Sequence, residues 1–413
     1  MSSDLDELGA WLRLLMVPRL GPASARRLLA AFGSPQGLFA ADPDAVRAVL
    51  PRFLPDALHA DTGWQAEQER TWAWLHDPKA EAPRAVLTLA DAGYPTPLLE
   101  AVDPPLVLFA EGDLNRWRRP AVAIVGSRNP TQQGAENAEA FARAISEAGV
   151  VVVSGLARGV DAAAHDGALQ PLESGELPFA GNLAGGTIAV LGTGFNEVYP
   201  KGHKPLARRI ARNGLVLSEF TLNTPPLAPN FPRRNRIVAA LSRGTLVVEA
   251  AVQSGSLITA RLANEMGREV LAIPGSIHSP QAKGCHALIK QGAKLVETAQ
   301  DVLEELRLSD APLTSHVVAN TLGSVDDGGC LEGGSSARST SVRAETSAFP
   351  SPDDHRDEDP VLRAMGHDPV GQDALSARTG LGPAELGARL LELELMGQVA
   401  RLPGALFQRL ARA

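Results

Sequence analysis

Five short apolar segments, each followed by a turn of small residues, constrain this chain more than any other feature. Each is rich in Val and Ile, is apolar at consecutive positions, and precedes a stretch with a helical pattern. Such segments are typical of parallel strands buried on both faces. They are AVAIVGSR (121–128), VVVSGLARG (151–159), TIAVLGTG (187–194), GTLVVEAAVQSGS (244–256) and EVLAIPGS (269–276). The alternation predicts an α/β fold: an extended Rossmann-like, doubly wound, mainly parallel sheet.

The loops that follow these five strands should meet at one edge of the sheet, which we call the rim. The carboxyl ends of parallel strands lie together, and doubly wound folds bind their ligands there. Turns of Gly and Ser at helix starts expose backbone N–H groups, which suit phosphate. The rim is therefore the predicted ligand site, and phosphate is the predicted ligand chemistry.

Composition bounds the remaining possibilities. A chain of 413 residues, 44% of them hydrophobic, predicts about two to three domains with a large core. The two cysteines, Cys285 and Cys330, form no CxxC, which disfavours a disulfide framework or a zinc site and fits a cytoplasmic protein. The start MSSDLDELGAWLRLL lacks the pattern of a secretory signal. No apolar run is long enough to span a bilayer, so no membrane partner is expected.

The net charge of −8 is concentrated in one segment. From Ser309 to Pro360 there are ten acidic and three basic residues. From Ala121 to Gln300 there are seventeen Lys and Arg residues against thirteen Asp and Glu residues. The predicted sheet domain is thus mildly basic, and polyanion binding by that domain stays open despite the acidic total.

The pattern along the chain predicts four parts. Residues 1–65 form a small helical domain of the SAM or helix–hairpin–helix kind. Its turn Arg19-Leu20-Gly21 either presents N–H groups to a DNA phosphate or belongs to a packing or partner module. Residues 66–308 form the extended Rossmann-like domain. Residues 309–358 have few large apolar side chains, which predicts a disordered acidic linker.

Residues 359–413 regain a regular pattern. Three helical stretches and a hairpin predict a winged-helix domain. Its third helix, within 383–397, carries three glutamates against a single arginine, Arg389. Because an acidic helix is a poor reader of the major groove, protein interaction stands beside DNA binding as an interpretation of this domain.

Several residues of the rim loops suit phosphate. Arg128 is placed to pair with a phosphate or to stack on a base, unless it forms a surface bridge with a carboxylate. Ser154 and Gly155 offer N–H groups, and Arg158 adds charge. Lys201 follows the third strand and is placed to reach the same edge.

The densest basic cluster, FPRRNR (231–236), lies at a helix start. Arginine there is unfavourable for the helix dipole. The misfit indicates either a bound anion or a buried carboxylate partner such as Glu219 or Glu249. Ser254, Gly255 and Ser256, which precede another helix, have the composition of an anion cradle.

Catalytic patterns are weak. The chain has no G-x-G-x-x-G after the first strand and no Walker A loop. Asp161 and His165, four residues apart on one helix, suggest an acid–base pair, but a structural pair that holds the loop is the favoured interpretation. No nucleophile with its base emerges, and the histidines lack metal-ligand spacing. We therefore expect no enzyme activity, no metal and no cofactor.

Taken together, the segments resemble the DprA family, also called Smf, of bacterial DNA-processing proteins. The matching stretches cover residues 94–297 in the family's order. They are YPTPLL, IVGSR, SGLARGVDAAAH, TIAVLGTG, VYPK, LSEF, FPRRNR, VVEA, SGSLITA, REVLAIPG and GCHALIKQGAKLV. The flanking helical and winged-helix modules resemble those of longer members.

The resemblance implies a single-stranded DNA-binding protein of natural transformation that protects incoming strands and loads the RecA recombinase. It implies a homodimer without a nucleotide cofactor, with dimer and recombinase surfaces at roughly Val270–Leu306. By motif, the residues that would hold the strand are Gly126, Ser127, Arg128 and Lys201. Those that would shape or extend the pocket are Arg234, Asn235, Arg236, Ser254, Gly255 and Ser256. With few aromatic residues in this domain, we expect arginine stacking rather than an aromatic platform.

The sequence leaves two other functions to consider. A nucleotide-processing enzyme with a Rossmann-like fold would carry a PGGxGTxxE-type motif, but GGTIAVLGTG lacks the paired acidic residue. Glu249 and Glu265 are the possible substitutes for it. A regulator that binds duplex DNA through the winged helix is disfavoured by the acidic third helix and by the large sheet domain.

Overall fold

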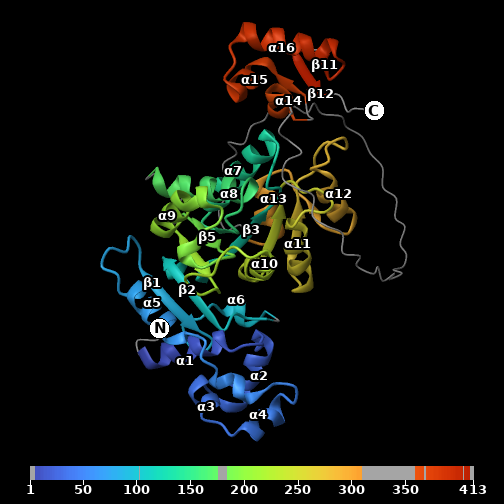
Figure 1. The fold of residues 1–413 in the computed structure, drawn as a ribbon. Coiled ribbons are helices and arrows are strands. Elements are labelled where there is room, and N and C mark those ends of the chain that lie inside the picture. Colours follow the sequence, from blue (N-terminus) through green and yellow to red (C-terminus); the bar gives the residue numbers. More distant parts are fainter. Residues whose placement is uncertain are drawn as a thin grey trace, which may run out of the picture.

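The computed structural model describes residues 5–101, 103–174, 184–308, 359–366, 369–402 and 404–409. Figure 1 shows an N-terminal helical part, a central sheet flanked by helices, and a small C-terminal domain. The predicted linker, with Cys330, lies outside the described residues. Within the described ranges, no helix combines the length and the apolar character that crossing a membrane requires.

The central sheet has nine strands in the order β1-β2-β6-β5-β4-β3-β7-β8-β9. All neighbours from β6 to β9 are parallel, whereas β2 is antiparallel to β1 and to β6. The strands are β1 (Arg84–Thr88), β2 (Val107–Gly112), β3 (Ala121–Val125), β4 (Val151–Ser154), β5 (Thr187–Val190), β6 (Leu215–Ser218), β7 (Gly244–Val247), β8 (Glu269–Ala272) and β9 (Lys294–Leu295). The predicted doubly wound, mainly parallel sheet is confirmed.

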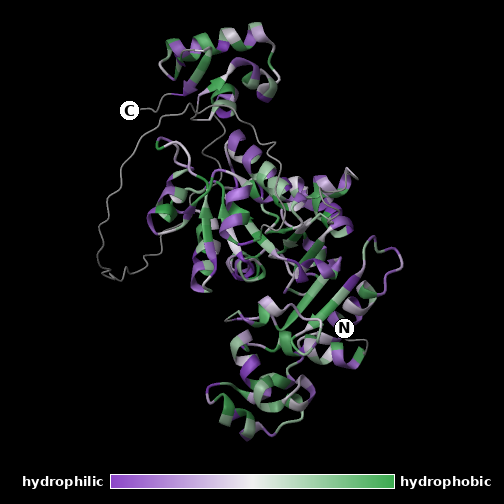
Figure 2. Ribbon diagram, turned by 180° about the vertical axis from the view of Figure 1, so that it is seen from behind, coloured by the Kyte–Doolittle hydropathy of each residue, from purple (hydrophilic) through white to green (hydrophobic). Residues whose placement is uncertain are grey.

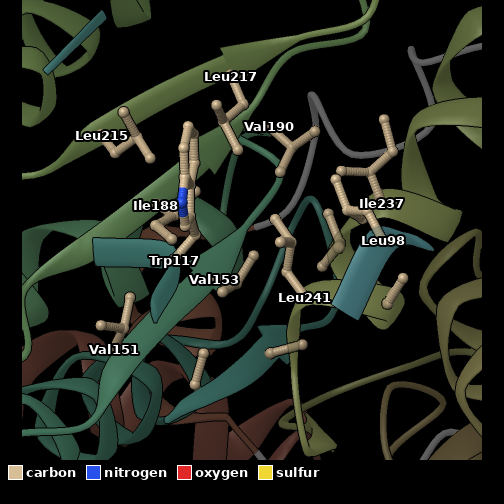
Figure 3. Packing of buried hydrophobic residues seen from close by; sticks show 14 of the residues in the cluster. Leu98, Trp117, Val151, Val153, Ile188, Val190, Leu215, Leu217, Ile237 and Leu241 are labelled. Atoms are coloured by element: carbon tan, nitrogen blue, oxygen red, sulfur yellow. The ribbon is translucent and has the colours of Figure 1, made fainter. Parts of the chain in front are cut away.

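Helices cover both faces of this sheet because alternate strand residues point to opposite sides. One core cluster joins Val153, Ile188 and Leu217 to Leu98 and Ile237 (Figure 3). The helices that contribute to it are α6 (Thr96–Leu99), α10 (Asn230–Leu241), α11 (Ser256–Glu265) and α12 (Lys283–Lys290). The helices on the opposite face are α7 (Gln132–Glu147), α8 (Val160–Glu173), α9 (Lys204–Asn213) and α13 (Ala299–Glu305). Figure 2 shows hydrophobic strands between helices of mixed character.

The N-terminal helices share a core with the antiparallel edge of the sheet. They are α1 (Leu5–Met16), α2 (Pro22–Phe32), α3 (Pro35–Phe39), α4 (Pro43–Val49) and α5 (Trp64–Leu75). Leu8 and Leu28 belong to the same cluster as Phe109 of β2. The turn before α2 places Arg19 at φ 61°, a left-handed conformation that favours glycine. The boundary at residue 65 stays a prediction, and the packing is continuous across it.

The C-terminal elements form a winged helix, as predicted. They are α14 (Pro360–Met365), β10 (Val370–Gly371), α15 (Gln372–Thr379), α16 (Pro383–Leu395), β11 (Val399–Leu402) and β12 (Leu406–Arg409). The strands form an antiparallel sheet in the order β10-β12-β11. Arg378 of α15 donates hydrogen bonds to Glu136 and Gln133 of α7 at 2.9 and 3.0 Å. This contact joins the winged helix to the sheet domain.

Candidate functional site

The loops after the parallel strands form one continuous surface, the rim. The carbonyl of Ser127 accepts the N–H of Val160 at 3.1 Å, which joins the β3 loop to α8. The ring of His203 bonds to the carbonyl of Leu156 at 3.0 Å, which joins the segment before α9 to the β4 loop. These contacts hold side chains from several loops at one edge.

Three cations of the rim face solvent. Arg128 follows β3, Arg158 follows β4, and Lys201 lies in the segment between β5 and α9. All three side chains are exposed, and none forms an ion pair with another described residue. The structure thus gathers three of the sequence-predicted residues as exposed positive charge outside any ion pair, and the charge of Arg128 also acts on the buried Asp161.

Gly126 and Ser127 shape the chain that presents Arg128. A Cβ atom on Gly126 would lie 2.7 Å from Cγ2 of Val160 and 2.9 Å from the carbonyl oxygen of Glu249, so a larger residue does not fit. Ser127 is buried, and its hydroxyl accepts the N–H of Asn129 at 3.1 Å. Both residues serve the loop's conformation, and Arg128 projects from it.

The loop after β4 is held by a carboxylate from the first turn of α8. Asp161 accepts the N–H groups of Gly155 and Ala157 at 3.1 and 3.2 Å. The hydroxyl of Ser154 is buried and donates to the carbonyl of Ile124 at 2.6 Å. The Gly155 amide that the sequence offered to an external anion is therefore bonded inside the protein.

A second carboxylate from within the protein, that of Glu249, binds the start of α7. Glu249 accepts the backbone N–H and the hydroxyl of Thr131 at 2.9 and 2.6 Å. At the start of α11 the hydroxyls of Ser254 and Ser256 lie 2.7 Å apart, while Gly255 is the exposed N-cap residue. The serines therefore bond to each other beside an accessible backbone.

The arginine cluster at the start of α10 is directed mostly inward. Arg234 is only 5% exposed and donates to the carbonyls of Gly155 and Val190, the latter at 2.7 Å. Burial lowers its pKa, and the charge of Asp161 opposes that shift. Burial likewise raises the pKa of Asp161, against the charge of Arg234.

Arg236 and Asn235 of the same segment lie nearer the surface than Arg234. Arg236 forms an ion pair with the buried Glu219 and donates to the carbonyl of Asp103 at 2.5 Å. The prediction of a buried carboxylate partner is confirmed for this arginine. Asn235 is half-buried, with its amide nitrogen 3.5 Å from the carbonyl of Gly255, so it links α10 to the turn before α11.

His165 is held as a neutral ring. Its Nε2 accepts the N–H of Leu156 at 3.3 Å, and its Nδ1 lies 2.7 Å from the hydroxyl of Thr187. Because that hydroxyl donates to Val152, it accepts from Nδ1. Burial, reinforced by the charge of Arg234, lowers the pKa of His165 to about 3. His165 thus bonds to the loop backbone, as Asp161 does. The predicted role of the two in holding the loop is confirmed, although each bonds to the backbone rather than to the other.

The sequence singles out Tyr199 only as part of the VYPK stretch. Tyr199 is 47% exposed and stands two residues before Lys201, and its ring centroid lies 5.6 Å from that of Phe231. It therefore offers an aromatic face beside a cation on the rim. The available signal was an aromatic residue in a strand-end loop next to a lysine.

Comparison with known proteins places these features in a family. Residues 85–307 match the model of DNA recombination-mediator protein A, and residues 345–405 match the DprA winged helix domain. The chain is 40% identical to Protein Smf of Escherichia coli K12, over 84% of this chain and 81% of that protein. It is 47% identical to DNA processing protein DprA of Streptococcus pneumoniae R6, over 53% and 73% of the two chains.

A solved structure gives the same result. The X-ray structure of DNA processing protein A from Streptococcus pneumoniae superposes with a TM-score of 0.55 at 38% identity. It covers 73% of this chain and 95% of that chain. The fold and the family are therefore supported by independent comparisons.

Replacement of Arg234 should destabilise the protein far more than replacement of its neighbour. Arg234→Ala leaves two strand-end carbonyls and Asp161 without their buried partner, so we expect a loss of roughly 3 kcal/mol in unfolding free energy. Arg233→Ala, the control, removes an exposed side chain whose ion pair with Glu219 is long, at 3.7 Å, and leaves Glu219 paired with Arg236, so it should cost under about 1 kcal/mol. Urea unfolding measures both, and equal losses would contradict the role of Arg234.

His165 should make stability depend on pH. Its pKa is about 3 when folded, against about 6.5 when unfolded, so the unfolded chain binds the extra proton between these values. Stability is therefore lost as pH falls from about 6.5 toward 3, by roughly 1.4 kcal/mol per pH unit from this group. Unfolding of wild type and His165→Gln at pH 7 and pH 5 tests this, because only wild type should show the extra decline. Parallel declines would contradict it.

Proposed function

The chain belongs to the DprA/Smf family of DNA-processing proteins, and on that premise we propose that it binds single-stranded DNA along the rim. We propose further that it protects this strand and delivers it to the RecA recombinase during natural transformation and recombination, as a cytoplasmic homodimer. The observation that carries the proposal is that Arg128, Arg158 and Lys201, on adjoining loops, are exposed and form no ion pair with a described residue. A polyanion is the ligand that such a surface attracts.

The rim favours a single strand over a duplex. The exposed face of Tyr199 beside Lys201 suits an unpaired base, whose face a duplex hides by stacking. Arg128 combines charge with a planar group that stacks on bases. Cations that bind phosphates and a ring that stacks on bases do not discriminate between bases, so such a site binds a strand of any base sequence.

Side chains rather than backbone cradles would contact the phosphates. Asp161 already accepts hydrogen bonds from two amides of the β4 loop, and Glu249 accepts one from Thr131 at the start of α7. The residues that would then shape the rim from beneath are Gly126, Ser127, Ser154, Gly155, Arg234 and Arg236. Asn235 and the Ser254-Gly255-Ser256 turn would extend it. Exposed cations that bind phosphates give a steep dependence on salt.

Binding without turnover is the activity we propose. Asp161 and His165, the nearest approach to an acid–base pair, are buried and bonded to loop amides. Glu249, a candidate acid for a nucleotide-processing enzyme, holds Thr131. The alternative enzyme would need a carboxylate directed at the ligand, and these three groups are directed at the protein's own backbone.

The winged helix does not favour duplex recognition. Arg389, the single arginine of α16, forms ion pairs with Asp359 and Glu392. Leu391 and Leu395 of the same helix are 56% and 81% exposed. An acidic helix with exposed leucines suits a protein partner better than a phosphate backbone.

Exposed apolar residues support the proposed partner surface. Ile277 and Leu295, 74% and 50% exposed, lie within Val270–Leu306. Leu295 belongs to β9, the last strand of the sheet, whose outer edge pairs with no described strand. An unpaired sheet edge with exposed apolar side chains nearby fits contact with a second copy or with a recombinase.

Removing two of the three rim cations should weaken binding of the single strand. In Arg128→Ala/Lys201→Ala, the loss of two charged phosphate contacts should weaken single-strand affinity at least about tenfold. The slope of log K against log salt should fall by roughly 1.4. Fluorescence anisotropy of a labelled oligonucleotide, single-stranded and duplex, measures both.

The control for this measurement is Arg52→Ala/Arg243→Ala, which removes two exposed arginines that have no ion pair among the described residues. Arg243 directly precedes β7, at the end of the sheet opposite the rim. The control should bind as wild type does. Equal wild-type affinity for duplex, or no effect of the rim variant, would overturn the proposal.

Tyr199 should contribute through its ring. Tyr199→Ala should cost roughly 1–3 kcal/mol of binding free energy, the worth of one base stacked on an aromatic side chain. Tyr199→Phe keeps the ring and should retain affinity, which separates stacking from loss of the hydroxyl. The same anisotropy assay applies, and equal effects of both variants would contradict a stacking role.

A further inference from the structure

A groove lies between α5 and α9, at the edge of the sheet formed by β1, β2 and β6. Its cavity has a volume of about 320 Å³. One wall is apolar and includes Leu191, Phe195 and Val216, with Trp74 of α5 opposite α9. We call this cavity the α5–α9 groove. Its size and its mixture of apolar wall and convergent charges are those of a ligand site.

Positive charge in the groove exceeds the negative charge. Lys79, Lys204 and Arg208 line it, are exposed, and form no ion pair with any residue in the described ranges. The two carboxylates of the lining have arginine partners: Glu81 pairs with Arg212 at 2.8 Å and Glu111 with Arg84 at 2.9 Å. The groove therefore attracts an anion.

The groove continues from the rim. Lys204 begins α9, three residues after Lys201, and Arg208 follows one turn later. Leu191 and Phe195 belong to the same β5 loop that carries Tyr199. Arg209 points elsewhere, because it pairs with Asp166 and Glu173 at 2.6 and 2.8 Å. The unpaired cations thus form a row that leads from the rim into the groove.

The groove also offers aromatic surface. Phe195 is half-buried, and its ring centroid lies 5.1 Å from that of Trp74. Aromatic side chains beside a track of cations are the combination by which proteins bind single strands without reading their sequence. A free phosphate would use only the cations, whereas a nucleotide strand would use both.

We propose that the α5–α9 groove is a second subsite for the strand bound at the rim. Phosphates pass Lys204 and Arg208, and an unpaired base lies against Phe195. This inference rests on the proposed function, because its ligand is the strand that leaves the rim at Lys201. The binding surface thereby extends from the sheet domain onto the N-terminal helices.

The test compares oligonucleotides of two lengths, about 4 and about 16 nucleotides, which span the usual range for single-strand sites. Anisotropy is measured for the full chain as wild type, as Lys204→Ala/Arg208→Ala, and as the control Arg52→Ala/Arg243→Ala. We expect the groove variant to bind the short oligonucleotide as wild type does. It should bind the long one at least about tenfold more weakly at low salt, with a salt slope smaller by roughly 1.4.

A second variant tests the aromatic wall. Phe195→Leu keeps an apolar side chain and should weaken only the long oligonucleotide. A groove variant equal to wild type on the long oligonucleotide would overturn the second subsite and leave the rim proposal standing. Equal weakening on both lengths would also overturn it, because the cations would then belong to the rim site. A wild type that binds neither oligonucleotide would overturn the proposed function itself.

Discussion

One buried guanidinium holds the rim in shape. Arg234 reaches from α10 to the carbonyls of Gly155 and Val190, at the ends of the neighbouring strands β4 and β5. A charge in a dry interior is costly unless its surroundings compensate it, so this side chain fixes the loops that compensate it. With the β4 loop fixed, Asp161 gathers its amides and Arg158 is left on the outside.

This arrangement bears on the kind of ligand that the rim suits. In a nucleotide-binding fold, the amides of such loops and helix starts receive the ligand's phosphates. Here Asp161 and Glu249 take amides of that kind, so the positive charge toward solvent comes from long, exposed side chains. Such side chains adapt to many positions of a backbone, which suits a polymer better than a single compact nucleotide.

Much of this fold could be predicted from the sequence because its strands are buried on both faces and therefore apolar at consecutive positions, as in 121–125. The pairing of β2 with β6 could not, since it joins segments about a hundred residues apart and depends on packing. Within the site, Arg128 and Arg234 have similar local sequences. Only the position of α10 under the rim makes one exposed and the other buried, and Glu249 meets Thr131 from 118 residues away.

The N-terminal helices gain a physical role on the proposed path of the strand. The antiparallel strands β1 and β2 extend the sheet beyond β6, and the cores of the helices and of this edge are continuous. Trp74 of α5 contacts both Phe109 of β2 and Phe195 of the rim loop. The cations Lys204 and Arg208 of α9 are exposed, and an exposed charge by itself contributes little binding energy. The edge gives them an apolar wall, which strengthens their attraction for a phosphate and supplies a surface for its base.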